Sequence, residues 1–236
     1  MHVNEVSMDI ENDEERLIKL FKLAGDEFQP WLFPDEDVWR RARQNSIGAS
    51  DAAAVMGISP WKTEAQLWDE KANGKMLDFH NSDTVRGHRS ESHILELYGI
   101  ETGRKIFSGE RIMLMSNHIP FMSCTLDGID FTDKYNPIII EVKSVKFSHG
   151  EWSDEKIPDY YFTQLLHQLA VTRWNEAILL VRFTRNEGWE SASERMYHVK
   201  REDVQDQIDK LVRKENKFWN EYVVNKKRPP CRMPTL

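Results

Sequence analysis

One short run limits what this chain can fold into and do more than any other: Ile138-Ile139-Ile140-Glu141-Val142-Lys143. Its β-branched residues follow Pro137 and predict a buried strand, in which alternate side chains share a face. Glu141 and Lys143 are therefore expected to point the same way, while Val142 points into the core. The run predicts a carboxylate and an ammonium group side by side where an apolar strand ends.

A second carboxylate precedes this strand, at Asp127 in Leu126-Asp127-Gly128. If Asp127 lies on a neighbouring strand, two carboxylates and one ammonium converge, which is what Mg²⁺-dependent cleavage of a phosphodiester needs. Asp127 and Glu141 would hold the cation, Mg²⁺ or alternatively Mn²⁺. Lys143 would act electrostatically or as a base, and the sequence leaves both roles open. The structural alternative is an ion pair at a strand end.

The pattern of an acid, any residue and Lys is common, so its context has to decide. Three other copies occur: Asp69-Glu70-Lys71, Asp154-Glu155-Lys156 and Glu215-Asn216-Lys217. The first and last lie in helical patterns, where residues two apart do not face each other, and the second lies in a polar loop. Only the copy at Glu141 follows an apolar strand, which makes a nuclease the leading hypothesis.

The length and composition predict one globular domain with two short flanking segments. With 236 residues, 40% of them hydrophobic, the chain can bury one substantial core. We expect an acidic N-terminal extension with a helix at 1–37, a single nuclease domain at 38–225 and a basic, Pro-containing tail at 226–236. The chain contains two cysteines, Cys124 and Cys231. Two are too few for a disulfide scaffold or a four-cysteine zinc site, and we expect structural thiols in a reducing compartment.

Charge and hydropathy constrain partners and location. No apolar stretch approaches a membrane span, and the first residues lack the pattern of a secretory signal, so we expect a cytosolic protein without membrane contact. The net charge of −7 argues against nucleic-acid binding through bulk positive charge. Local basic patches remain open at Arg40-Arg41-Arg43 and Lys226-Lys227-Arg228, and each could equally be a solvated face.

Hydrophobic periodicity and turn residues predict an alternation of helices and strands. Helices are expected at 13–23, 38–44, 52–56, 63–74, 83–98, from 158 onward and at 202–225. Strands are expected at 105–107, 111–115, 122–131, 138–145, 177–181 and 195–199, with a turn at 31–34. The pattern indicates a mixed α/β fold built on a meandering sheet.

Several motifs occur in a fixed order around the strand of Glu141. They are Trp39, Arg43, Ile47-Gly48-Ala49-Ser50-Asp51, Gly57-Ile58-Ser59-Pro60, Arg86-Gly87-His88-Arg89-Ser90-Glu91, Leu126-Asp127-Gly128 and Tyr161-Phe162-Thr163-Gln164-Leu165-Leu166-His167-Gln168-Leu169. In this order they resemble the YqaJ-like viral recombinase family of phage lambda-type alkaline exonucleases. The resemblance runs from about Trp39 to Asn175. It implies an α/β (mixed α+β) fold with a restriction-endonuclease-like PD-(D/E)xK core, a central mixed β-sheet flanked by helices.

The resemblance also assigns roles to the residues that match. It implies a catalytic core of Asp127, Glu141 and Lys143, with Glu91 as a further acid near the metal. The metal-ligand set that it carries over is Asp127, Glu141 and Val142. A helical Glu such as Glu91, with apolar neighbours three and four positions on, could otherwise form a boundary salt bridge.

A pocket for a terminal 5′-phosphate beside the metal is a further implication of the resemblance. Four polar residues would form it: Arg43, Ser50, Thr125 and Gln164. An Arg offers a forked donor to phosphate, and a hydroxyl at a turn before a helix adds another, which makes the assignment chemically sensible. His167 and Gln168, on the same helix as Gln164, are expected to be structural neighbours.

The function that the resemblance implies is a Mg²⁺-dependent 5′-to-3′ exonuclease. It would degrade one strand of linear double-stranded DNA and leave 3′ single strands for recombination. It would work as a ring-shaped homotrimer with a single-strand annealing protein as partner, in the cytosol of a bacterial host of a phage or prophage. The alternatives are an endonuclease that cuts internally and a DNA-binding assembly module without catalysis. The second is disfavoured because Asp127, Glu141 and Lys143 are all present.

Overall fold

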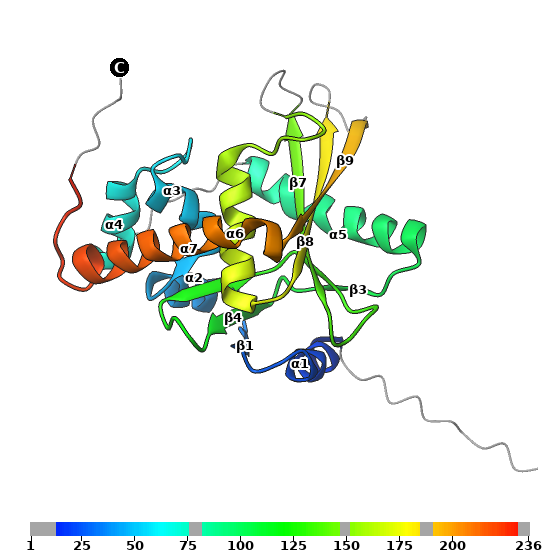
Figure 1. Ribbon diagram of the computed structural model, residues 1–236, viewed down its shortest axis with the longest axis horizontal. Coiled ribbons are helices and arrows are strands. Elements are labelled where there is room, and N and C mark those ends of the chain that lie inside the picture. The colour runs from blue at the N-terminus through cyan, green and yellow to red at the C-terminus, as the bar shows by residue number, and fades with distance from the viewer. Residues whose placement is uncertain (1–12, 76–81, 147–151, 185–190, 231–236) are drawn as a thin grey trace, which may run out of the picture.

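The strands of the protein form two sheets. The computed structural model describes residues 13–75, 82–146, 152–184 and 191–230 (Figure 1). The strands are β1 (Phe28–Leu32), β2 (Ile47–Gly48), β3 (Ile106–Ser108), β4 (Ile112–Ser116), β5 (Met122–Thr125), β6 (Gly128–Asp130), β7 (Ile138–Lys146), β8 (Glu176–Thr184) and β9 (Ser191–Lys200). One sheet has the order β1-β4-β5-β2 and the other β3-β6-β7-β8-β9. Both contain parallel and antiparallel pairs. The prediction of a mixed α/β fold is confirmed, with the expected central sheet divided in two.

Helices pack around these sheets. They are α1 (Asp13–Leu23), α2 (Glu36–Gln44), α3 (Ala52–Met56), α4 (Glu64–Asn73), α5 (Ser82–Thr102), α6 (Asp159–Thr172) and α7 (Arg201–Lys217), with a 3₁₀ turn η1 (Ala49–Asp51) and a π-helical segment η2 (Phe218–Val223). Local chemistry sets their ends. Thr63 and Gln66 exchange hydrogen bonds at the start of α4, and Gly74, with a φ of 69°, ends it.

Most of the predicted helices are confirmed, and the structure differs from the predicted elements at a turn, at the end of one helix and at one strand. Of the segment expected as a turn at 31–34, Trp31 and Leu32 form the end of β1, which pairs antiparallel with β4, and Phe33 and Pro34 lie beyond the strand. The helix expected at 83–98 continues to Thr102, because Gly99 keeps helical geometry and Gly103, with a φ of 68°, provides the stop. The single strand expected at 122–131 is two strands, β5 and β6, in different sheets.

The chain changes sheets at Leu126-Asp127, between β5 and β6. Gly128 follows at once, and packing requires a glycine there. A Cβ atom on Gly128 would lie 2.5 Å from Cδ2 of Leu95 and 3.3 Å from Cβ of Ile140. The Leu-Asp-Gly motif therefore places an acidic side chain at the junction of the two sheets, directly under α5.

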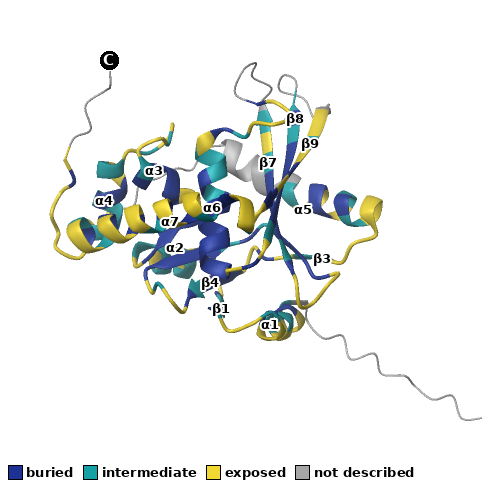
Figure 2. Ribbon diagram, in the orientation of Figure 1, coloured by how far each residue is buried: buried dark blue, intermediate teal, exposed yellow. Residues whose placement is uncertain are grey.

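The five-stranded sheet is covered on both faces. Helix α5 packs Ile94, Leu95 and Tyr98 against Ile140, Val142, Ile178 and Leu180. On the other face, α6 belongs to the main core together with Ile139, Leu179 and Val181, and α7 lies across α6 (Figure 1). Most of α6 is buried, as its dark colour in Figure 2 shows. Any polar side chain that α6 turns toward the sheet is consequently held in a nearly solvent-free environment.

Other expectations concern the flanking segments and the cysteines. Helix α1 contributes Leu17 and Phe21 to the main core, and the division of the chain at 37 and 225 stays a prediction. Cys124 is a buried free thiol, and burial raises its pKa, as expected of a structural cysteine. Cys231 lies outside the described residues.

Within the described ranges, no helix combines the length and apolar character required to cross a membrane.

Candidate active site

Strand β7 carries the first two groups of the site. Glu141 and Lys143 occupy alternate positions and point the same way, with Nζ of Lys143 donating to Oε1 of Glu141. Val142, between them, packs on the opposite face against α5. Glu141 is only 1% exposed. The expected geometry at this strand is confirmed: a buried carboxylate paired with an ammonium group.

Asp127 joins them from the junction of the two sheets. Its Oδ2 accepts a hydrogen bond of 2.8 Å from the main-chain N–H of Val142. Burial and the neighbouring charge of Glu141 raise the pKa of Asp127 well above its usual range, and Glu91 on α5 adds to the effect. Lys143 and the Val142 N–H act in the opposite direction. Two acids separated by the β6–β7 hairpin are therefore close enough to interact electrostatically, with Glu91 nearby.

Lys143 is held in its charged form. Burial alone would lower the pKa of the ammonium group, but the attraction of Glu141 and Asp127 outweighs it and raises the pKa. The positive charge of Lys143 thus partly offsets the negative charge of the three acids around it, Asp127, Glu141 and Glu91. Lys143 supplies a fixed positive charge beside the two carboxylates.

Helix α6 holds the carboxylate of Glu141 from the other side. The amide Nε2 of Gln164 donates to Oε1 at 2.5 Å, and that of Gln168 donates to Oε2 at 2.5 Å. Residues four apart lie on one helix face, so both amides reach the same carboxylate. Gln168, expected only as a structural neighbour, touches the catalytic candidate directly. Gln164 also binds Glu141, and its place in the phosphate pocket stays a prediction.

A buried ion pair joins α6 to α7. Nδ1 of His167 contacts Oε1 of Glu215 on α7 at 2.8 Å, and Nε2 contacts the main-chain oxygen of Ser123 at 3.0 Å. Both partners are acceptors, so His167 donates from both nitrogens and is positively charged. Burial opposes this charge, but Glu215 outweighs burial and raises the pKa of His167. The pair fastens α6 to α7 and to β5.

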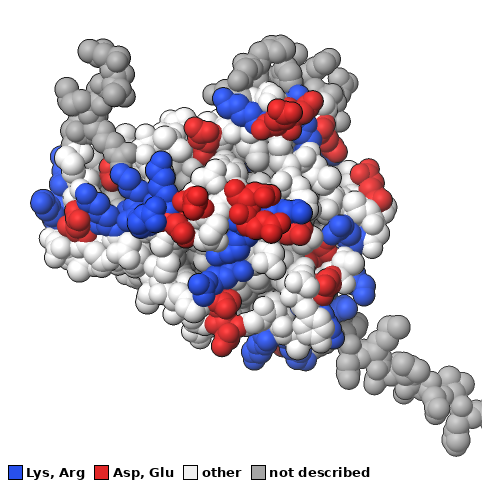
Figure 3. Space-filling view, in the orientation of Figure 1, with Lys and Arg blue, Asp and Glu red and all other residues white. Residues whose placement is uncertain are grey.

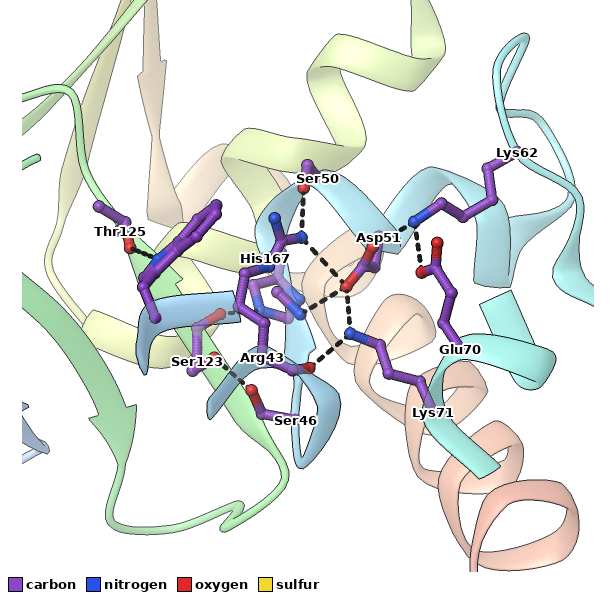
Figure 4. Close-up of polar contacts among 12 residues, drawn as sticks. Arg43, Ser46, Ser50, Asp51, Lys62, Glu70, Lys71, Ser123, Thr125 and His167 are labelled. Atoms are coloured by element: carbon purple, nitrogen blue, oxygen red, sulfur yellow. Dashed lines mark hydrogen bonds and ion pairs between the residues drawn. The ribbon is translucent and has the colours of Figure 1, made fainter. Parts of the chain in front are cut away.

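A second polar centre surrounds the turn after β2 (Figure 4). A nitrogen of Arg43 donates to Oγ of Ser50 at 2.7 Å, and the guanidinium lies 4.9 Å from the ring centre of Trp39. Nε1 of Trp39 in turn donates to the hydroxyl oxygen of Thr125 at 3.2 Å. A hydroxyl that accepts a bond still has its own proton to donate. Three of the four residues predicted to bind a terminal phosphate are linked in this way.

Asp51 is the buried anion at the middle of this centre. Its carboxylate meets Lys71 at 2.8 Å and both Arg43 and Lys62 at 3.3 Å, and it accepts from the N–H of Gly48 at 3.2 Å. Burial would raise its pKa, but the three cations outweigh burial and hold the pKa well below its usual range. One buried carboxylate therefore gathers three basic side chains.

The three basic side chains around Asp51 differ in how exposed they are, and therefore in whether they can contact a ligand. Lys71 is 3% exposed and also donates to the main-chain oxygen of Arg43 at 2.7 Å, so it supports the cluster from inside. Lys62 also pairs with Glu70 at 2.6 Å. Arg43 and Lys62 remain partly exposed. With three cations and two carboxylates, this cluster (hereafter the Asp51 cluster) has an excess of positive charge, which favours an anion.

The donor set at the first centre fits a hard divalent cation. Within the residues that the structure describes, no three His, Cys, Asp or Glu side chains are grouped closely enough to hold a metal ion. Magnesium usually takes only one or two carboxylates and completes its shell with water and substrate oxygens. Asp127 and Glu141 provide those two. Val142 donates its N–H to Asp127, and its role as a ligand stays a prediction.

Sequence reasoning missed several groups that the fold brings to the site. Asp51 and Lys71 belong to the Asp51 cluster, yet Asp51 was considered only as part of a turn motif and Lys71 only as part of an acid-x-Lys copy in a helix. The four-residue spacing of Gln164 and Gln168 was the available signal for Gln168. The motif at 86–90 cannot be assessed, because the side chains at these positions lie outside the described part of the chain.

Comparison with solved structures places this fold among exonucleases. The protein is similar to an alkaline exonuclease from Laribacter hongkongensis, LHK-Exo, with a TM-score of 0.62 and 20% identity over 81% of this chain and 94% of that one. A phage-related exonuclease from Haemophilus somnus 129PT gives a TM-score of 0.52 and 12% identity over 80% of this chain and 99% of that one. At these identities, the likeness defines the class of fold.

The family follows from the sequence match. Residues 38–175 match the YqaJ-like viral recombinase domain, and the chain belongs to this family. It is also 27% identical over 198 residues to "Uncharacterized protein YqaJ" of Bacillus subtilis (strain 168). That match covers 82% of this chain and 58% of the relative, so the chain spans less than two thirds of that relative's length. The resemblance predicted from the motifs is confirmed.

Proposed function

We propose that this protein is a metal-dependent exonuclease that degrades one strand of linear double-stranded DNA from a phosphorylated 5′ end. The observation that carries the proposal is the convergence of Asp127, Glu141 and Lys143 at the junction of two sheets. These are two carboxylates and an ammonium group, the set that metal-assisted phosphodiester hydrolysis requires. LHK-Exo, whose fold is similar, has been solved in complex with dAMP, a nucleotide of the kind this reaction would release.

Each residue of the proposed active site has a separate role in this reaction. Asp127 and Glu141 would hold Mg²⁺, or Mn²⁺ in its place, and a bound ion of this kind activates water and offsets the charge of the phosphate. Gln164 and Gln168 fix both oxygens of Glu141, so that the carboxylate does not turn away. Lys143 places a positive charge where negative charge builds up on the scissile phosphate. Glu91 adds a third acid at the margin of the site.

The Asp51 cluster supports a preference for strand ends. Arg43 and Ser50 lie within hydrogen-bond distance of each other, and both can donate to one phosphate. The cluster has excess positive charge, and Asp51 holds the guanidinium in position from below. A terminal 5′-phosphate bound there would set the distance from the strand end to the metal, and cleavage would remove one nucleotide at a time.

DNA binding by a chain of net charge −7 requires a local basic surface. The C-terminal half of α7 offers one, with exposed Lys210, Arg213, Lys214 and Lys217, while the acids of this helix are mostly in its N-terminal half (Figure 3). A ring-shaped homotrimer would require only its channel to be basic. Such an enzyme would leave 3′ single strands for an annealing protein, in the cytosol of a bacterial host of a phage or prophage.

The test uses four DNA substrates. Linear and closed circular duplexes, the linear ones with and without a 5′-phosphate, are incubated with the protein and Mg²⁺, and released nucleotides are measured. We expect mononucleotides from linear DNA only, fastest from phosphorylated 5′ ends, and none in EDTA. Glu141→Gln, checked for folding by its melting temperature, is expected to lower the rate at least a hundredfold, because one of two metal carboxylates is lost.

Three other results of this test would each indicate a different function. Linearisation of the circle would indicate an endonuclease, since a terminal-phosphate pocket has no role in an internal cut. Release from the 3′ end first would reverse the polarity. A folded protein that cuts none of the substrates with Mg²⁺ or Mn²⁺ would be a DNA-binding module.

A further inference from the structure

Aromatic side chains form a continuous group beside the catalytic lysine. Trp61, in the loop between α3 and α4, meets Tyr160 edge to face at a ring-centre distance of 5.1 Å and Tyr161 at 5.7 Å. The two tyrosines, in the first turn of α6, are 4.6 Å apart. Trp152 lies 5.4 Å from Tyr161 on the other side. Four rings therefore run from the surface into the protein.

The inner end of this group is at the active site. The ring centre of Tyr161 lies 5.8 Å from Nζ of Lys143. Tyr161 also precedes Gln164 by three positions on α6, so the ring and the amide that holds Glu141 share a helix face. Trp152 is buried and packs against Phe183 and Tyr197, which fixes this end. Whatever contacts the rings at the outer end is two side chains away from the reacting groups.

The outer end is open to solvent. Trp61 is 59% exposed, although Trp68, Trp152 and Trp174 are all nearly buried. Exposure of so large an apolar ring forfeits the stabilisation that its burial would give. The neighbouring residue, Lys62, binds Asp51 and so ties this loop to the Asp51 cluster. The loop that carries the exposed indole is thus tied to the Asp51 cluster, and the indole itself contacts the tyrosine that lies beside Lys143.

We propose that Trp61, with Tyr160 at its side, is a stacking subsite for a nucleobase at the end of the DNA strand. Nucleobases stack on aromatic faces whatever their sequence, and an enzyme that shortens any strand requires contacts of that kind. A base can use the indole face only after it leaves its own stack in the duplex, so the occupant is an unpaired terminal base. The inference rests on the proposed function, since it assigns the ligand as a DNA end.

Photocrosslinking tests the contact without any cleavage. A duplex with 5-iodouracil as the 5′-terminal base is mixed with the protein in EDTA, irradiated and mapped by mass spectrometry. We expect the crosslink on Trp61 or Tyr160, and none from 5-iodouracil placed twenty base pairs inside the duplex. A crosslink from the terminal base that maps only elsewhere would overturn the proposal.

Equilibrium binding in EDTA supplies a second measurement. Removing the terminal base to leave an abasic site is expected to weaken binding to the wild type about tenfold, the order of one stacked base. The same change should have little effect on Trp61→Ala and an intermediate effect on Trp61→Phe. Tyr135→Ala is the matched control, because Tyr135 is 65% exposed in the hairpin at the far end of β7. Equal loss in wild type and Trp61→Ala would refute the subsite.

These results separate the two proposals. The wild type could release nucleotides from linear DNA while the crosslink maps away from Trp61 and Tyr160 and the abasic end weakens binding equally in wild type and Trp61→Ala. The nuclease proposal then stands and the subsite is refuted. If the terminal base contacts Trp61 but no DNA is cut with Mg²⁺ or Mn²⁺, the subsite belongs to a DNA-end binding protein. Melting temperatures of Trp61→Ala and Trp61→Phe equal to that of the wild type exclude misfolding as the cause.

Discussion

The carboxylate of Asp127 accepts the main-chain N–H of Val142, which lies between Glu141 and Lys143, at 2.8 Å. The bond joins the point where the chain changes sheets to the strand that carries the other two groups. A main-chain donor cannot swing away, so the distance between the two acids depends on the backbone and not on rotamers alone. This link explains how Asp127, at the junction of the two sheets, meets Glu141 and Lys143 of β7 in one site.

Replacing Asp127 by Asn separates catalysis from folding. Asn keeps an oxygen for the Val142 N–H but removes a buried charge that is repelled by Glu141. We expect metal-dependent nuclease activity to fall at least a hundredfold, while the free energy of unfolding in EDTA stays the same or rises. Urea denaturation measures the second quantity. A loss of more than ~2 kcal/mol would mean that the charge itself stabilises the fold.

Gln168 is expected to be a positioning residue for Glu141. Gln168→Met keeps the side-chain length but removes the donor to Oε2. Changing a group that orients a metal ligand typically costs ten- to a hundredfold in metal affinity or activity. We expect the Mg²⁺ concentration for half-maximal rate to rise by about that factor. Gln205→Met, on the outer side of α7, is the control and should leave it unchanged.

The preference for phosphorylated ends is expected to depend on the shape of Arg43. Arg43→Lys keeps the charge near Asp51 but loses the planar fork that reaches Ser50 and stacks on Trp39. We expect the rate ratio between 5′-phosphorylated and 5′-hydroxyl ends to fall about tenfold, with little change on hydroxyl ends. An unchanged ratio would remove Arg43 from the phosphate pocket. Arg40→Lys, where the arginine pairs with exposed Glu36, is the matched control.

The buried pair of His167 and Glu215 predicts a dependence of stability on pH. The pKa of His167 is raised in the folded protein, so the stabilisation is complete below the unfolded value of 6.5 and is lost as pH rises through the folded pKa. The wild type should therefore lose stability as the pH rises above 6.5 and through the folded pKa of His167. His167→Asn should lack this slope and unfold with ~3 kcal/mol less free energy, since Glu215 loses its partner. Parallel slopes for both proteins would contradict the assignment.

Gly128 is expected to be required by packing under α5. Gly128→Ala places a methyl group 2.5 Å from Cδ2 of Leu95, which should lower the free energy of unfolding by ~1 to 3 kcal/mol. Leu95→Ala alone should also destabilise, because it opens a cavity. The double variant should cost less than the sum of the two, since the new methyl fills part of that space. Additive losses would show that the clash lies elsewhere.

Much of the fold could be predicted from local pattern. The end of the first helix at Leu23 is confirmed, and so is the α4 cap at Thr63, because periodicity, capping and glycine stops act within one or two turns. The segment 122–131 shows the limit of such patterns. Its side chains are suitable for a strand throughout, but in the tertiary structure the chain passes from one sheet to the other at Leu126-Asp127, where Gly128 packs closely under α5.

The candidate site, like the fold, has features that local sequence pattern predicts and features that depend on tertiary packing. The sequence by itself determined that Glu141 and Lys143 share a face, because the two-residue repeat of a strand is a property of the backbone. Tertiary structure alone decided that Gln168 holds Glu141, that Asp51 gathers Arg43, Lys62 and Lys71, and that Trp61 is exposed beside the tyrosines of α6. These contacts join residues of different helices, strands and loops, and their energies depend on burial and charge in three dimensions, which a linear pattern does not encode.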